Sequence, residues 1–212
     1  MKKVFFALII ITALACKNDK KETDKAIEPI EITKKEVLTS IKFPAYPGWG
    51  KVGIEITEIP EMFSNQKVYE LARVSKTSKS SFAHTQNIPV NYASIYRASI
   101  IVKKGKASNL FGLRISGAYP DRVDAVFNLE NGTVKGVVKG RDFENESANI
   151  EPLGNDWYKC SVTAEVAADE VKIIFGPTTR AMSVNGWEGK TNIDCNSYIL
   201  PLSLALEEIS FE

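Results

Sequence analysis

The sequence predicts an all-β protein, an antiparallel β-sandwich of the jelly-roll type. Apolar and polar residues alternate in several short segments, and this period of two is typical of strands that bury one face. Turn-forming pairs such as Asn131-Gly132 and Gly154-Asn155 separate those segments. No window after residue 40 has a convincing helical stripe. Short strands at this spacing favour a sandwich of about eight strands.

The individual strands follow from the alternation. In the first, Val52, Ile54 and Ile56 alternate with small or polar neighbours. Further strands are expected at 95–102, 111–116, 123–129, 157–162, 171–175 and 198–206. In the last of these, leucines at every second position predict one long strand with a single buried face.

The N-terminus reads as a targeting segment. Lys2 and Lys3 precede an apolar run at 4–15, which is shorter than the roughly 20 residues that span a bilayer. The end of this run, Ala13-Leu14-Ala15-Cys16, resembles the lipobox of bacterial lipoproteins, whose cysteine is acylated and becomes the mature N-terminus. The resemblance implies a signal peptide at 1–16 and a lipid anchor on Cys16. The chain would then sit at a bacterial membrane, in the periplasm or at the outer membrane or cell surface. The alternative is an ordinary secretory signal with a chance cysteine.

A charged segment follows. Residues 17–25 contain no apolar side chain and cannot offset the entropy lost on ordering. We therefore expect a flexible tether at 17–40 and one jelly-roll domain at 41–212.

Composition excludes several function classes. The formal net charge is +1, from 27 basic and 26 acidic residues, so a nucleic-acid partner is not expected. The only histidine, His84, excludes a multi-histidine metal site and leaves little material for a catalytic triad. Cys160 and Cys195 are compatible with either a disulfide or buried free thiols.

Three segments carry a family resemblance. They are IYRASIIVKKG (95–105), FNLENGTV (127–134) and IEPLGNDWYKCSVT (150–163). These segments resemble strands and a hairpin of carbohydrate-binding-module-like jelly rolls, and GWEG (186–189) fits the close of that family. The resemblance implies a galactose-binding-like sandwich, as in glycan-binding modules and phage tail or adhesion proteins. It also implies a structural calcium as a candidate, with oxygen donors among Glu55, Asp194, Glu207 and Glu208.

Aromatic residues in loops are the first candidates for a ligand site. Sugar rings stack on aromatic side chains, and Trp187, Tyr119 and Trp49 each lie beside glycine or proline in expected loops, as does Tyr46. The alternative for both tryptophans is that they close the core.

Charged residues supply the second group of candidates. Arg114, Arg97 and Arg73 lie in expected strands, where they would line a groove and bind hydroxyls or the carboxylate of an acidic sugar. Asp121 and Arg122, beside Tyr119, would add hydrogen bonds, as would Asp124. The alternative is a solvated sheet face with ordinary salt bridges.

These observations predict a lipid-anchored carbohydrate-binding module that is not an enzyme, with a glycan or envelope polysaccharide as its partner. The second hypothesis is a structural or protein-interaction module of the cell envelope, with an envelope protein as its partner. A polysaccharide lyase or hydrolase is the third. The sequence motifs of jelly-roll alginate lyases are missing here.

Overall fold

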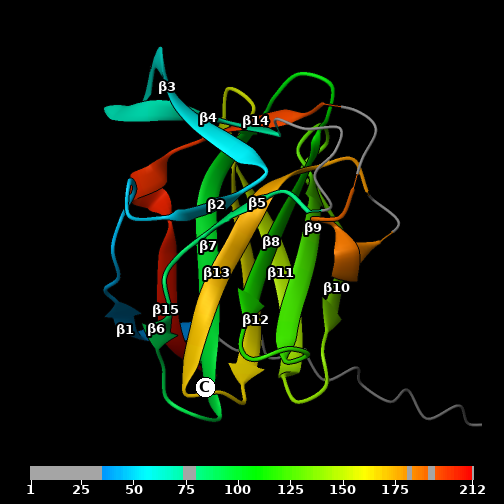
Figure 1. The fold of residues 1–212 in the computed structure, drawn as a ribbon. Helices are drawn as coiled ribbons and strands as arrows, with labels where there is room; N and C mark the ends of the chain where they lie inside the picture. The colour runs from blue at the N-terminus through cyan, green and yellow to red at the C-terminus, as the bar shows by residue number, and fades with distance from the viewer. Residues whose placement is uncertain (1–34, 74–79, 181–182, 191–193, 212) are drawn as a thin grey trace, which may run out of the picture. The chain divides into compact units, whose positions relative to one another are not determined.

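The computed structural model describes residues 35–73, 80–180, 183–190 and 194–211. Within them the chain forms two antiparallel sheets packed face to face (Figure 1). The first sheet contains β1 (Lys35–Ile41), β3 (Ile54–Phe63), β4 (Gln66–Arg73), β7 (Ser94–Lys104), β11 (Glu144–Gly154), β12 (Trp157–Val166), β14 (Asn196–Ile199) and β15 (Ala205–Phe211). The second contains β2 (Gly50–Val52), β5 (Phe82–His84), β6 (Ile88–Pro89), β8 (Leu110–Ser116), β9 (Arg122–Asn128), β10 (Thr133–Lys139) and β13 (Glu170–Thr178).

The strand order is that of a jelly roll. In the first sheet β12 pairs with β7, and β14 and β15 pair one after the other along the opposite edge of β7. In the second sheet the neighbours are β9, β8, β13 and β5. The chain therefore crosses between the sheets from β4 to β5 and β7, and again from β12 to β13 and β14. The expected all-β sandwich is confirmed.

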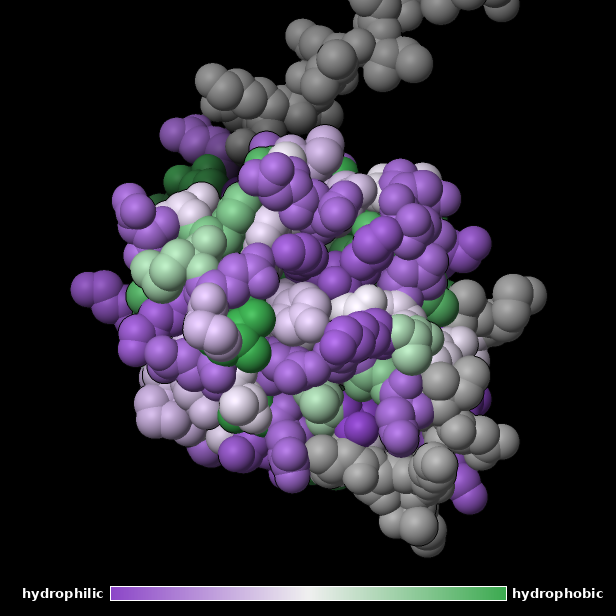
Figure 2. Space-filling model, turned by 90° about the horizontal axis from the view of Figure 1, so that it is seen from above, coloured by the Kyte–Doolittle hydropathy of each residue, from purple (hydrophilic) through white to green (hydrophobic). Residues whose placement is uncertain are grey.

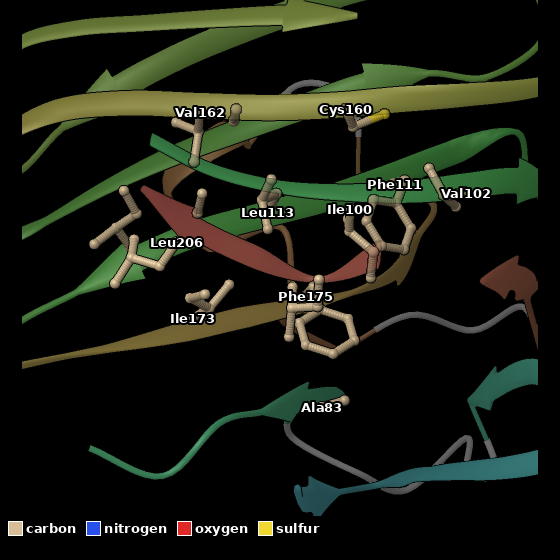
Figure 3. Packing of buried hydrophobic residues seen from close by; sticks show 14 of the residues in the cluster. Ala83, Ile100, Val102, Phe111, Leu113, Cys160, Val162, Ile173, Phe175 and Leu206 are labelled. Atoms are coloured by element: carbon tan, nitrogen blue, oxygen red, sulfur yellow. The ribbon is translucent and has the colours of Figure 1, made fainter. Parts of the chain in front are cut away.

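The core lies between the two sheets. Figure 3 shows Ile100 and Leu206 of the first sheet meeting Leu113 and Phe175 of the second. All four side chains are fully buried. The alternation at 111–116 and 171–175 therefore predicted the inward faces of β8 and β13 correctly.

Two parts of the sequence prediction are wrong. The expected strand at 198–206 is interrupted by the 3-10 turn η2 (Pro201–Ser203), because a proline has no N–H to donate to a ladder. Leu202 consequently points outward and is 74% exposed. The domain also begins earlier than residue 41, since β1 starts at Lys35 and pairs with β15.

On each sheet, the face that points away from the core is partly covered by another part of the chain. The β3–β4 hairpin folds over the first sheet, where Phe63 stacks on Trp157 with ring centroids 4.8 Å apart. Residues 183–190, with the 3-10 turn η1 (Val184–Gly186, orange in Figure 1), pack on the second sheet. Among the described residues no helix is long and apolar enough to cross a membrane. The expected signal peptide with Cys16, and the expected tether up to residue 34, lie outside the described residues.

Candidate functional site

Trp187 is buried in the structure, although the sequence suggested an exposed ring. It lies in the 183–190 segment, its side chain is 0% exposed, and its Nε1 donates to Asp124 Oδ1 over 3.0 Å. The indole fits directly over Gly112, where an added Cβ would come within 2.1 Å of the ring. The absence of a side chain at residue 112 thus creates the seat for this tryptophan, whose ring has no free face for a sugar.

Charged residues hold this segment on the sheet. Arg114 Nε donates to Asp124 Oδ1 over 2.6 Å, and its Nη2 donates to Glu188 over 2.9 Å. Arg122 Nε lies 3.0 Å from Asp124 Oδ2. Burial raises the pKa of the Asp124 carboxyl, while the two arginines act in the opposite direction. We call these residues the Trp187 clamp: Arg114, Arg122, Asp124, Trp187 and Glu188.

The three arginines expected to line one groove do not do so. Arg114 belongs to the second sheet and is buried in the clamp. Arg97 lies on the first sheet and forms an ion pair with Glu207 at 2.7 Å. Arg73, at the end of β4, is also buried, and its Nη2 donates to two backbone carbonyls of the 183–190 segment. The expected arginine groove does not form, because Arg73 and Arg114 are both buried against the 183–190 segment and Arg97 is paired with Glu207.

Trp49 closes one edge of the core. It is 6% exposed and meets Phe175 edge-on, with ring centroids 5.0 Å apart, and Tyr46 at 5.6 Å. The alternative assignment of Trp49 to the core is thus the one that fits the structure.

An open groove lies on the part of the second sheet that the clamp leaves uncovered. Its volume is about 660 Å³, within the range of small-molecule sites. We call it the outer groove; it is lined by Val52, Phe82, His84, Asn87, Ser116, Gly117, Ala118, Asp121, Ala167, Ala168, Asp169, Glu170, Val171, Lys172 and Ile174. The register places Ile174 between His84 and Arg114, and Lys172 opposite Ser116.

The outer groove combines ring faces with hydrogen-bonding groups. Phe82 and His84, both on β5, have ring centroids 5.9 Å apart. His84 Nδ1 lies 2.8 Å from the Thr85 carbonyl oxygen, which can only accept, so Nδ1 carries a proton. Asn87 donates to Glu170 over 2.5 Å, which fixes one rim of the groove.

Two of the predicted site residues belong to this groove or its rim. Asp121 lines it, at the end of the turn that follows β8. Tyr119 lies in the same turn and is 85% exposed, with the Arg122 guanidinium 5.6 Å from its ring centroid. The sequence interpretation therefore located one side of the groove.

The other side of the groove was missed. Phe82, His84, Asn87 and Lys172 come from segments that meet only when β5 and β13 pair. A short alternation at 82–84 was the only local signal, and it does not indicate which strand lies beside it.

Two of the suggested calcium donors are engaged by other side chains. Glu207 is paired with Arg97, and Glu208 accepts from Asn91. In the described part of the chain, no group of three His, Cys, Asp or Glu side chains could hold a metal ion. Cys160 and Cys195 are both buried and free, so the pair does not form a disulfide.

Neither a protein-family model nor a curated protein sequence matches this chain. Function is therefore inferred from the outer groove and from the sequence.

Proposed function

We propose that this protein is a carbohydrate-binding module that takes a glycan or envelope polysaccharide in the outer groove, without catalysis. The observation that carries the proposal is an open groove of about 660 Å³ on a sheet face, with the Phe82 ring on one side and polar groups around it. Apolar ring faces match the C–H faces of sugars, and groups such as Asn87, Ser116 and Asp121 match their hydroxyls. Tyr119 offers a further exposed ring beside the groove.

The proposal includes a lipid anchor at Cys16, which rests on the lipobox-like sequence alone. An anchored module would hold a polysaccharide close to a bacterial membrane. The charged segment after Cys16 would let the domain extend away from the membrane surface.

Binding should depend on the aromatic side of the groove. Phe82→Ala is expected to weaken saccharide binding by about tenfold, because it removes a ring that lines the groove. The measurement is a screen of the purified full-length chain against neutral, amino and acidic oligosaccharides, followed by calorimetric titration of the hits. Tyr92→Ala is the matched control, since Tyr92 is 65% exposed and lies outside the groove.

Two results would contradict the proposal. One is a folded protein that binds no saccharide in the screen. The other is an equal loss of affinity in Phe82→Ala and Tyr92→Ala.

A protein-interaction module of the cell envelope is the second candidate. It is favoured by the burial of all three tryptophans and by the exposure of Leu202, which lines two hollows, one of them together with Tyr46 and Tyr69. Figure 2, however, shows an end of the molecule that is mostly hydrophilic, with hydrophobic residues only in small separate groups. If no saccharide binds in the screen, the protein-interaction module becomes the favoured function.

A further inference from the structure

We infer that the outer groove selects neutral and amino-bearing saccharides and rejects uronic or sulfated ones. This inference rests on the proposed saccharide binding and names the class of ligand.

The first step concerns the arginines on this face of the second sheet. Arg114 forms ion pairs with Asp124 and Glu188. Arg122 forms an ion pair with Asp124, and its Nη2 donates to the Asn185 carbonyl over 2.7 Å. Both guanidinium groups therefore bind the protein itself and leave little positive charge for a ligand.

The second step concerns the charges that line the groove. Asp121, Asp169 and Glu170 are its acidic groups, and Lys172 is its one fixed cation among the lining residues. Asp121 forms a long ion pair with the exposed Arg141, whose Nη2 is 3.9 Å from Oδ2. Glu170 receives a neutral donor, the Asn87 amide. The three acidic groups of the lining thus face two cations, Lys172 and Arg141, which leaves a net negative charge in the groove.

The third step follows from the shape. A cleft lined mainly by one sign of charge concentrates the electric field inside it. Carboxylates accept hydrogen bonds from hydroxyl and ammonium groups, and they repel carboxylate and sulfate. A neutral sugar or an amino sugar can therefore donate hydrogen bonds to the carboxylates of the groove. A polyuronate is repelled by them.

The test compares three probes on the full-length chain: a glucosamine oligomer, a xylose oligomer and a galacturonate oligomer of equal length. We expect the glucosamine oligomer to bind about tenfold more tightly than the galacturonate oligomer at low salt, with the difference shrinking as salt is added. The double variant Asp121→Asn, Glu170→Gln should reduce this preference. The control variant Glu36→Gln, Glu151→Gln changes net charge equally at exposed positions on the first sheet and should keep it.

The outcomes separate the two ideas. Equal or tighter binding of the galacturonate oligomer would overturn the inferred selectivity and leave saccharide binding intact. An identical effect of the groove and control variants would overturn it as well, because the preference would then arise from overall charge. Binding of none of the probes would overturn the proposed function and the selectivity together.

Discussion

At the scale of single residues, Gly112 determines how the outer face of the second sheet is covered. The indole of Trp187 occupies the space that a side chain at position 112 would fill. Gly112→Ala is therefore expected to lower the free energy of unfolding by about 1–3 kcal/mol, since the ring must shift away from a closely packed site. Urea unfolding followed by tryptophan fluorescence measures the loss.

Gly176→Ala is the control for that prediction. It lies on the neighbouring strand β13, and an added Cβ there would meet its nearest atom at 3.5 Å, an ordinary contact. A stability change within about 0.5 kcal/mol is expected for Gly176→Ala. If both alanine variants lose the same stability, the seat for Trp187 is not the cause.

The two buried cysteines should not react with thiol reagents in the folded protein. Burial raises the pKa of the Cys195 thiol to about 11 and that of Cys160 well above its ordinary value, so both stay protonated at pH 8. In the full-length Cys16→Ser variant we expect no reaction with a maleimide before denaturation and two reactive thiols afterwards. Because neither thiol is bonded, a reducing agent should leave the melting temperature unchanged. Rapid labelling of the native protein would contradict this prediction.

At the scale of elements, the 183–190 segment acts as a structural cover. Hydrophobic contact and charge hold it together, since Trp187 packs with Leu110, Val126 and Ile174 while Glu188 pairs with Arg114. The cover explains why β8 and β9 are buried on both faces. An alternating pattern cannot reveal such a cover, because the covering residues lie far along the chain: 63 positions separate Asp124 from Trp187, and 74 separate Arg114 from Glu188.

Removal of Asp124 should release this cover. Asp124→Ala removes the carboxylate shared by Arg114, Arg122 and Trp187 and leaves Arg114 with Glu188 alone, and breaking a buried pair in this way costs about 3–5 kcal/mol of stability. The control is Glu144→Ala, which breaks a much more exposed pair with Lys139 and should cost no more than about 1 kcal/mol. Thermal and urea unfolding measure both variants. Similar losses in the two would show that the clamp adds no more than an ordinary surface pair.

The β3–β4 hairpin plays a comparable part on the first sheet. Its tip brings Phe63 onto Trp157, and Glu61 forms an ion pair with Lys103 at 3.1 Å. The sequence predicted a strand near the start of this hairpin. It did not predict that the tip folds back over the sheet, because this depends on contacts with residues distant in the sequence, such as Trp157.

At the scale of the whole molecule, the fold was more predictable than the site. Alternation and turn pairs depend on local sequence, and they were sufficient to predict β7, β8, β12 and β13. The interruption at η2 was missed because the leucine pattern at 198–206 outweighed the signal from Pro201. Of the residues that line the outer groove, only Asp121 was among the predicted site residues, because one side of the groove depends on long-range pairing of β5 with β13.

The register also fixes where the groove lies relative to the chain ends. Lys35 pairs with Phe211, so the start and the end of the described domain are neighbours. Ile95 of β7 pairs with Ile209 of β15, and the adjacent Ser94 pairs with Val166, which leads into the turn at the groove. Both ends of the domain and one rim of the groove therefore share a pole of the sandwich. A bulky group attached at Lys35 or Phe211 would stand near that rim of the groove, whereas a small fluorophore there would sense an arriving ligand.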